Sequence, residues 1–407
     1  MGETIPETEL SDEGWLPVYS ATERDKFYGY VDERKPLVEN GDLVIPARGN
    51  SIGFVKLVRA SATATQTTIV ANVLDHKITD SAYVYYWCLG LRRILFYFDR
   101  TAIPQITTEY VSRNPLLLPA LAEQTQIARF LDHETARIDA LIEEQQRLIE
   151  LLKEKRQAVI SHAVTKGLDP TVPMKDSGVE WLGEVPAHWA LVPFGLAFEY
   201  QEGPGIMAVD FRDEGVPLVR ISGVQGRWVT LEGCNYLEPS KVKEKWAHFR
   251  LDEGDLVISG SASMGLVSEV GEDAAGAVAY TGLIKLKPRA NVSVRDFIRS
   301  VVGSYQFHAQ IDLLKSGSTI QHFGPTHLSQ MKVVLPPVNE QAQIAAYVDN
   351  ISVQFEELLS EAGKANALLQ ERRSALISAA VTGKIDVRGW QPPASTQALE
   401  LAVAEAV

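Results

Sequence analysis

Two short loops rich in small polar residues carry side chains suited to hydrogen bonding with nucleic-acid bases. "ARGNS" (47–51) and "SGSAS" (259–263) both follow closely on the apolar motif GDLVI. Arginine forms two hydrogen bonds with the edge of guanine, and asparagine does the same with adenine. The candidate contacts in these loops are Arg48, Asn50, Ser51, Ser259, Ser261 and Ser263. A tight hairpin uses the same small residues merely to complete its turn, and this alternative stays open.

A second pair of loops offers further polar side chains. "IPQIT" (103–107) and "IQHFG" (320–324) occupy matching places in the two halves of the chain. They add Gln105, Gln321 and His322 as candidate base contacts. The candidate phosphate contacts are Arg92, Arg93, Arg100, Lys241, Lys243, Lys245 and Lys315. Such charges are also common on solvated surfaces that bind nothing.

The sequence lacks the motifs of enzymes that act on DNA. Neither "RNPLLLP" (113–119) nor "VLPPVN" (334–339) supplies the [DNS]PP[FY] loop of an adenine methyltransferase, and "VTGKID" is an incomplete phosphate loop. Three histidines, His308, His322 and His327, lack cysteine or carboxylate companions at a spacing that suits zinc. The sequence therefore predicts no catalytic residue and no metal site.

Composition limits where the chain works and how it could hold DNA. Its 407 residues suffice for two or three domains, and Cys88 and Cys234 lie too far apart for a CxxC pair. The apolar stretch 82–98 is interrupted by two arginines and is too short for a membrane span, so a cytoplasmic protein is expected. A net charge of −13 argues against a chain that grips DNA alone. A partner would have to supply much of the basic surface.

The chain contains a tandem duplication. Residues 119–169 align with 336–386 without a gap at an offset of 217, and 20 of these 51 positions are identical. The best-matched part is "EKRQAVISHAVTKGLD" (154–169), which returns as "ERRSALISAAVTGKID" (371–386). Upstream, "NGDLVI" (40–45) matches "EGDLVI" (253–258) at an offset of 213. Each copy is therefore a variable globular part followed by a better-matched segment.

The better-matched segment has the composition of a long helix. No proline or glycine occurs between residues 124 and 162. Alternating steps of four and three trace one apolar seam through Leu141 and, in the second copy, an equivalent seam through Leu358, which is typical of a coiled coil. Lys155 and Arg372 interrupt the two seams at equivalent positions. A glycine follows each helix and can cap it.

These patterns predict an α+β protein, in which two β-rich mixed domains are separated by two long helices. The expected boundaries are 1–118 for the first domain, 119–168 for the first helix, 169–180 for a linker, 181–335 for the second domain, 336–386 for the second helix and 387–407 for a tail. The second domain begins with "WLGEVPAHWALVPFGLAFEY" (181–200), which has no counterpart before the first. The first domain is therefore expected to be short at its N-terminus.

Several stretches resemble the specificity (S) subunit of type I restriction–modification enzymes. These stretches are "LPPVNEQAQIAAYVD", "QERRSALISAAVTGKIDVRGW", "MKDSGVEWLGEVPAHW" and "GDLVISGSASMGLVSEV". The resemblance covers nearly the whole chain and is strongest in the helical segments. It implies two target recognition domains that each read half of a split sequence in double-stranded DNA, and an antiparallel coiled coil between them.

The resemblance also implies partners and an absence of activity in this chain. Two methyltransferase (M) subunits would carry S-adenosylmethionine, and restriction (R) subunits would use ATP and magnesium, so no cofactor is expected here. Two readers related by a half-turn match the pseudo-two-fold symmetry of DNA, with centres about 34 Å apart, one DNA turn. The alternative is a coiled-coil scaffold with two protein- or ligand-binding lobes and no role on DNA.

Overall fold

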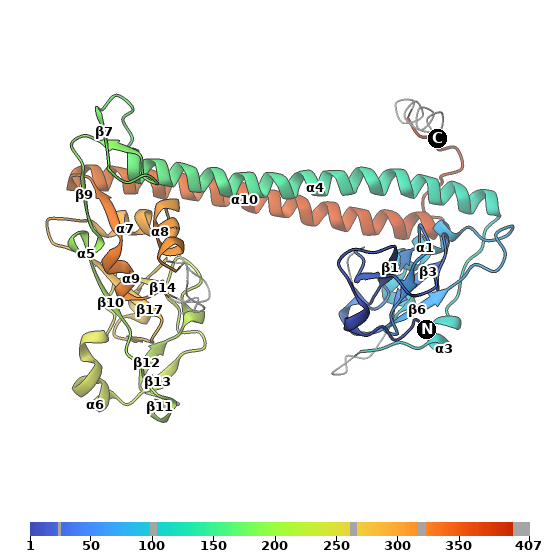
Figure 1. Ribbon diagram of the computed structural model, residues 1–407, viewed down its shortest axis with the longest axis horizontal. Coiled ribbons are helices and arrows are strands. Elements are labelled where there is room, and N and C mark those ends of the chain that lie inside the picture. The colour runs from blue at the N-terminus through green and yellow to red at the C-terminus, as the bar shows by residue number, and fades with distance from the viewer. Residues whose placement is uncertain (23–25, 98–103, 261–266, 316–322, 394–407) are drawn as a thin grey trace. The chain divides into compact units, whose positions relative to one another are not determined.

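The chain divides into two compact units, each built from one globular part and one half of each long helix (Figure 1). This computed structural model describes residues 1–22, 26–97, 104–260, 267–315 and 323–393. Unit 1 comprises Met1–Arg147 and Ala362–Val407, and unit 2 comprises Leu148–Glu361. Strands and helices occur together in both units, so the predicted α+β class is confirmed.

The two long helices begin after prolines and end at glycines. Helix α4 spans Leu121–Lys166 and helix α10 spans Val338–Val381. Gly167 and Gly383 have φ of +80° and +72°, a conformation that glycine adopts at little cost and that ends a helix. The predicted glycine caps are therefore present in both copies.

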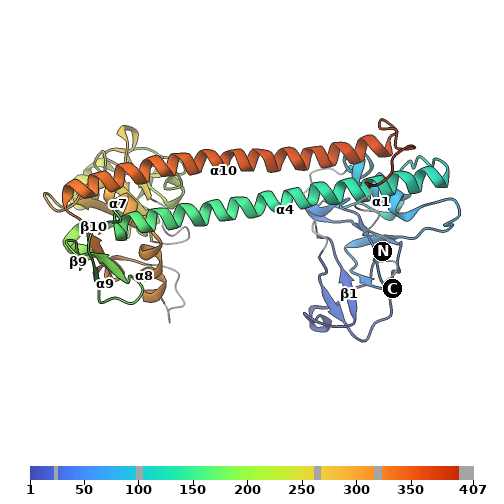
Figure 2. The same cartoon turned by 90° about the horizontal axis from the view of Figure 1, so that it is seen from above.

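Within each unit the two helix halves lie side by side and run antiparallel (Figures 1 and 2). In unit 1, Arg373 forms two hydrogen bonds with Asp139, at 2.7 and 3.0 Å. In unit 2, Arg156 donates to Glu356 at 3.2 Å. Arg156 and Arg373 are 217 positions apart, as are Asp139 and Glu356, which is the offset of the repeat. The duplication therefore repeats an ion pair as well as a helix. The predicted antiparallel coiled coil is confirmed.

The seam lies partly one residue further along the helices than predicted. Leu141 and Leu358 are each 47% exposed, whereas Ile142 and Leu359 are half-buried. The basic residues that enter the seam are Arg156 and Arg373, and the predicted Lys155 and Arg372 are exposed. Apolar or basic residues occupy both neighbouring positions in the sequence, so periodicity alone could not choose between them.

Unit 1 holds two small sheets. Strands β1 (Leu16–Tyr19), β2 (Gly29–Val31) and β5 (Thr63–Ala64) form one sheet, in which β1 pairs antiparallel with β2 and parallel with β5. Strands β3 (Leu43–Pro46), β4 (Lys56–Leu57) and β6 (Thr68–Ala71) form an antiparallel sheet with β3 in the middle. Helices α1 (Ser81–Gly90), α2 (Arg92–Leu95) and α3 (Thr108–Ser112) follow the strands.

Unit 2 repeats this topology with additional strands. Its sheets have the orders β11-β13-β12-β16 and β10-β17-β14-β15. The strands of the first sheet are β11 (Phe211–Arg212), β12 (Val216–Val219), β13 (Asn235–Leu237) and β16 (Val278–Ala279). Those of the second are β10 (Phe198–Glu202), β14 (Leu256–Ser259), β15 (Val267–Glu269) and β17 (Leu283–Pro288). The parallel pairing of β12 with β16 matches that of β1 with β5.

Residues 174–193 of unit 2 contribute strands to two further two-stranded sheets. Strand β9 (Ala190–Pro193) pairs with β18 (Lys332–Leu335), and β7 (Met174–Asp176) pairs with β8 (Glu184–Pro186). The helices of this unit are α5 (Phe194–Ala197), α6 (Pro239–Lys241), α7 (Arg295–Val302), α8 (Tyr305–Lys315) and α9 (Pro325–Gln330). In the described residues of unit 1, no strand takes the place of β9 or β10.

A buried glutamine fixes the start of each long helix. Gln124 is fully buried, donates to the carbonyls of Pro119 (2.8 Å) and Ile78 (2.9 Å), and accepts from the N–H at the cap of α1 (2.9 Å). Gln341 makes the equivalent three bonds in unit 2, at 2.8, 2.9 and 3.0 Å. The repeated "EQ.QIA" motif therefore ties each helix to its own globular part.

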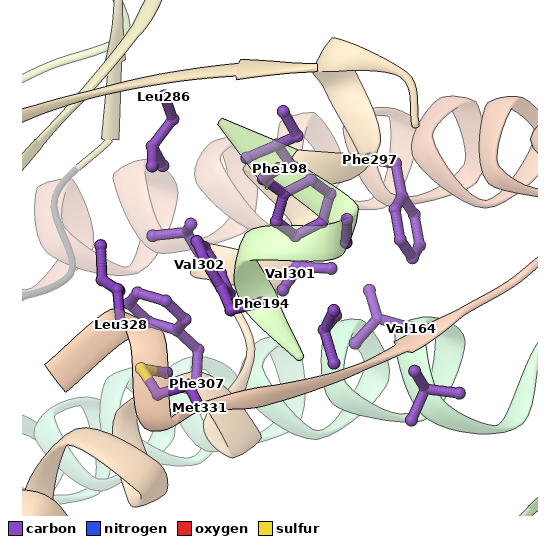
Figure 3. Close-up of a cluster of buried hydrophobic side chains, with 14 of the residues drawn as sticks. Val164, Phe194, Phe198, Leu286, Phe297, Val301, Val302, Phe307, Leu328 and Met331 are labelled. Carbon is purple, nitrogen blue, oxygen red and sulfur yellow. The ribbon is translucent and has the colours of Figure 1, made fainter. Parts of the chain in front are cut away.

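The repeated sixteen-residue stretch has a packing role. At the end of α4, Ile160, Ala163 and Val164 enter the core of unit 2. Figure 3 shows Val164 in this cluster with Phe194, Phe307 and Met331. At the end of α10, Ile377, Ala380 and Val381 enter the core of unit 1. Each helix thus starts on the globular part that precedes it and ends in the core of the other unit.

Candidate nucleic-acid interface

The structure brings together the two predicted loops of unit 1. Arg48, just after β3, and Gln105 form an antiparallel β-bridge. Gly49 N–H donates to the carbonyl of Pro104 at 2.9 Å, and Ile106 N–H donates to that of Ala47 at 2.9 Å. These backbone bonds hold two segments that are distant in the sequence at one place on the domain.

Unit 2 repeats the same junction. Phe323 N–H donates to the carbonyl of Gly260 at 2.8 Å, and these residues correspond to Ile106 and Ala47 in unit 1. Gly260, the residue that follows Ser259 of β14, is therefore paired in the same way as Ala47 after β3. The predicted contacts Ser261, Ser263, Gln321 and His322 lie outside the described residues, as does Arg100.

Burial separates the remaining candidates into two groups. Arg48, Asn50 and Gln105 are exposed. Ser51 is buried, and its hydroxyl donates to the carbonyl of Ala21 at 2.8 Å. Ser259 is fully buried at the end of β14. The burial of these two serines is at odds with direct base contact. Ser51 instead stabilises its loop from inside through the bond to Ala21.

Arg92 braces the unit 1 loop. Its Nε donates to the carbonyl of Ile52 at 2.8 Å, and one Nη donates to that of Asn50 at 3.3 Å. Its guanidinium also lies 3.5 Å from the centre of the Phe54 ring. These contacts give Arg92 a positioning role in the loop, and its contact with phosphate stays a prediction. Arg93, its neighbour, is exposed and stays a candidate for phosphate contact.

Helix α2 and the two residues after it include an exposed apolar surface that the motifs did not reveal. Ile94 is 71% exposed and Tyr97 is 65% exposed. The buried Phe96 lies against Gly53 of the loop, where a side chain would clash with the ring at 2.6 Å. An exposed aromatic ring beside polar side chains can stack on a nucleic-acid base. In the sequence these residues belong to the apolar stretch 82–98, which was considered only as a possible membrane span.

The basic residues of unit 2 divide in the same way. Lys241 pairs with Asp210 and lies 5.6 Å from the centre of the Trp246 ring, so its charge is partly neutralised within the protein. Lys243 and Lys245 are exposed on a short π-helical turn. These two remain available for phosphate contact. The side chain of Lys315, the other predicted contact, is not described.

A buried carboxylate anchors strand β15, which pairs with β14. Glu269 on β15 has a side chain only 6% exposed, and it pairs with Arg295 at 2.8 Å, Arg299 at 2.5 Å and Arg227 at 3.8 Å. Burial lowers the pKa of the Arg299 guanidinium, and the nearby charge of Arg227 lowers it further. Because Arg295 and Arg299 lie on α7, these ion pairs fasten β15 to that helix.

Neither a metal site nor a membrane helix is found in the part of the chain that the structure describes. No group of three or more histidine, cysteine or acidic side chains there is arranged to hold a metal ion. The Nδ1 of His327 accepts from Gly324 N–H at 3.1 Å, and burial lowers the pKa of His308. Both histidines are therefore used in packing. No described helix is long and apolar enough to cross a membrane.

Comparison with known proteins finds similarity to one family across both halves of the chain. Residues 1–152 and 198–363 match the family model described as the type I restriction modification DNA specificity domain. The chain is 23% identical over 390 residues to the type I restriction enzyme MjaVIII specificity subunit of Methanocaldococcus jannaschii, covering 92% of this chain and 87% of that protein. It is also 23% identical over 291 residues to the EcoKI specificity subunit of Escherichia coli, covering 67% and 58%.

The fold is similar to that of a solved chain. A chain from a study of complex assembly and conformational transition of the type I R-M system superposes with a TM-score of 0.68, covering 90% of this chain and 91% of that one. The two sequences are 16% identical. The likeness therefore concerns the fold.

Proposed function

The chain belongs to the family of the type I restriction modification DNA specificity domain, and on this premise we propose how its two units read DNA. It is the non-catalytic subunit that recognises the DNA sequence in a type I restriction–modification system. Each unit reads one half of a split target in double-stranded DNA. Arg48, Asn50 and Gln105 are the base-contacting candidates of unit 1, and the loop after Ser259 takes the equivalent place in unit 2.

The duplicated loop junction carries this proposal. The bond from Ile106 N–H to Ala47 and that from Phe323 N–H to Gly260 attach two differing loops in the same manner. Two readers of one design with different loop residues suit two half-sites of different sequence. The packing that repeats holds the readers in place, and the loops that differ carry the specificity.

The acidic composition supports a division of labour with partner chains. A net charge of −13 leaves little room for the counterion release that drives binding to DNA by a single chain. We therefore assign most phosphate contact to two methyltransferase subunits, which would also bring S-adenosylmethionine for adenine methylation. Restriction subunits that use ATP and magnesium would complete the nuclease form. The alternative, a scaffold with two ligand-binding lobes, lacks an observation in its favour.

Selection of sites from random duplex DNA tests the proposal. The chain assembled with its methyltransferase subunits should enrich a motif with two short defined blocks, and the chain alone should bind more weakly. A salt titration on the selected site should show an affinity that falls linearly with salt concentration when both are plotted as logarithms. An assembled complex that enriches no motif would contradict the proposal.

A further inference from the structure

Two aspartates at equivalent positions in the long helices hold different elements. Asp132 of α4 and Asp349 of α10 are 217 positions apart, which is the offset of the repeat. Asp132 accepts a hydrogen bond from the hydroxyl of Tyr86 at 2.7 Å, and the carboxylate of Asp349 lies 3.7 Å from an Nη of Arg227. Each contact lies within one unit. The repeat therefore has the same acidic side chain in both copies, with a different partner in each.

In unit 2, the partner of Asp349 belongs to a loop that pairs with the edge strand β15. This loop, residues 220–234, joins β12 to β13. Glu269 N–H donates to the carbonyl of Arg227 at 2.8 Å, and Val229 N–H donates to that of Glu269 at 2.8 Å. Residues 261–266, where two of the candidate base contacts lie, directly precede β15 in the sequence. The loop thus connects α10 to the strand on which the candidate segment ends.

The buried charge of Glu269 is compensated without Arg227. The Glu269 side chain pairs with Arg295 at 2.8 Å and with Arg299 at 2.5 Å, whereas an Nη of Arg227 lies 3.8 Å away. The Arg227 side chain is 50% exposed, and an ion pair between such exposed groups contributes little to stability. Removal of the Asp349 carboxylate should therefore leave unit 2 folded and release the loop from α10.

In unit 1, the equivalent aspartate holds the helix that leads to the loop after β3. Tyr86 lies on α1, and burial raises its pKa, so its hydroxyl keeps the proton that it donates to Asp132. One residue separates α1 from α2. Arg92 of α2 donates to the carbonyls of Ile52 and Asn50. The route from Asp132 to the loop therefore runs through two helices.

We propose that Asp132 and Asp349 are positioning residues that fix the candidate base-contacting loop of each unit relative to its long helix. Asp132 acts through α1 and α2, and Asp349 acts through the loop between β12 and β13. A side chain discriminates between bases only when it meets the base edge at hydrogen-bonding distance, so a small displacement of the loop costs specificity. The inference rests on the proposed function, in which each unit reads one half of a split DNA target.

Base discrimination at each half-site of the assembled complex tests the proposal. The quantity measured is the ratio of the affinity for the correct target to that for a target altered in one half. Asp349→Ala should lower this ratio about two- to fivefold at one half-site only, because an exposed ion pair is lost. Asp132→Ala should lower it at the other half-site. Asp349→Glu keeps the charge and should restore most of the discrimination.

The ratio separates positioning from a loss of stability. A variant that is merely less stable binds all targets more weakly and leaves the ratio intact. Asn350→Ala, an exposed neighbour on α10, is the matched control and should change neither ratio. Unchanged ratios with both aspartate variants, or losses that do not fall on different half-sites, would overturn the proposal. If the unaltered complex still selects a split target, only this inference fails; if it selects none, the proposed function fails.

Discussion

At the scale of single residues, a few exposed side chains depend on others that hold them in place. Arg48 and Gln105 are brought together by backbone pairing. Arg92 donates hydrogen bonds to two carbonyls of the loop that runs from Arg48 to β4. Residue type alone suggested a phosphate contact for Arg92. Its real partners became visible only when the fold placed α2 beside the loop, because those partners are backbone carbonyls that are distant in the sequence.

Replacing Arg48 by alanine should damage recognition at one half-site only. If the side chain reads a base, the loss is about 1–3 kcal/mol for the correct sequence, and discrimination at that position relaxes. Lys243→Ala is the control, because a phosphate contact should weaken binding to all sequences alike. Affinities of the assembled complex for targets altered in one half at a time give the answer. Uniform weakening by Arg48→Ala would assign that residue to the phosphate backbone instead.

The buried Tyr83 makes stability depend on pH in alkali. Its hydroxyl donates to Leu117, and burial raises its pKa to about 12. An unfolded tyrosine titrates near pH 10, so between about pH 10 and 12 only the unfolded state loses the proton. The free energy of unfolding should fall there by about 1.4 kcal/mol per pH unit from this group.

The variant Tyr83→Phe isolates that contribution. At pH 8 it should cost about 1 kcal/mol through the lost hydrogen bond. As the pH rises from 10 to 12 this deficit should shrink, because phenylalanine has no proton to retain. Urea unfolding of both proteins at several pH values measures the difference. Two curves that stay parallel throughout would refute the assignment.

At the scale of elements, the coiled coil illustrates what a periodic pattern can and cannot decide. The length and shared register of the helices were predictable, since 20 of 51 positions repeat without a gap. Their antiparallel direction was implied by the family resemblance. The buried face was placed one residue off at several of its positions. Leu141 stands beside Ile142, and Leu358 beside Leu359, so either choice satisfies the apolar pattern. Packing against the partner helix decides the matter, and that contact is absent from a single-helix pattern.

A pair of charge substitutions tests the corrected seam. Ile142→Asp should lower the free energy of unfolding by about 1–3 kcal/mol, because it places a charge in the half-buried seam. Leu141→Asp, one residue earlier, should have little effect, since that side chain is already 47% exposed. Thermal unfolding of the two variants under identical conditions provides the comparison. A larger loss from Leu141→Asp would restore the original register.

At the scale of the whole molecule, the duplication explains both the successes and the gaps of prediction. The α+β class, the repeat and the long helices follow from local composition and self-similarity. The packing of the end of α4 into the core of unit 2, and of the end of α10 into the core of unit 1, could not be predicted. Ile160 and Ile377 look like ordinary seam residues in the sequence. The base-contacting set was also over-predicted: Ser51 and Ser259 have suitable side chains but are buried.

We propose that the two units read two halves of one DNA target. Mapping methylated adenines in the DNA of cells that carry this chain with its methyltransferase subunit tests it most directly. We expect one motif made of two short defined blocks separated by a gap of unspecified bases. Exchanging the globular part of unit 2 for that of a relative should change one block and leave the other intact. A single continuous motif, or methylation without a motif, would show that the two units do not read two separate half-sites.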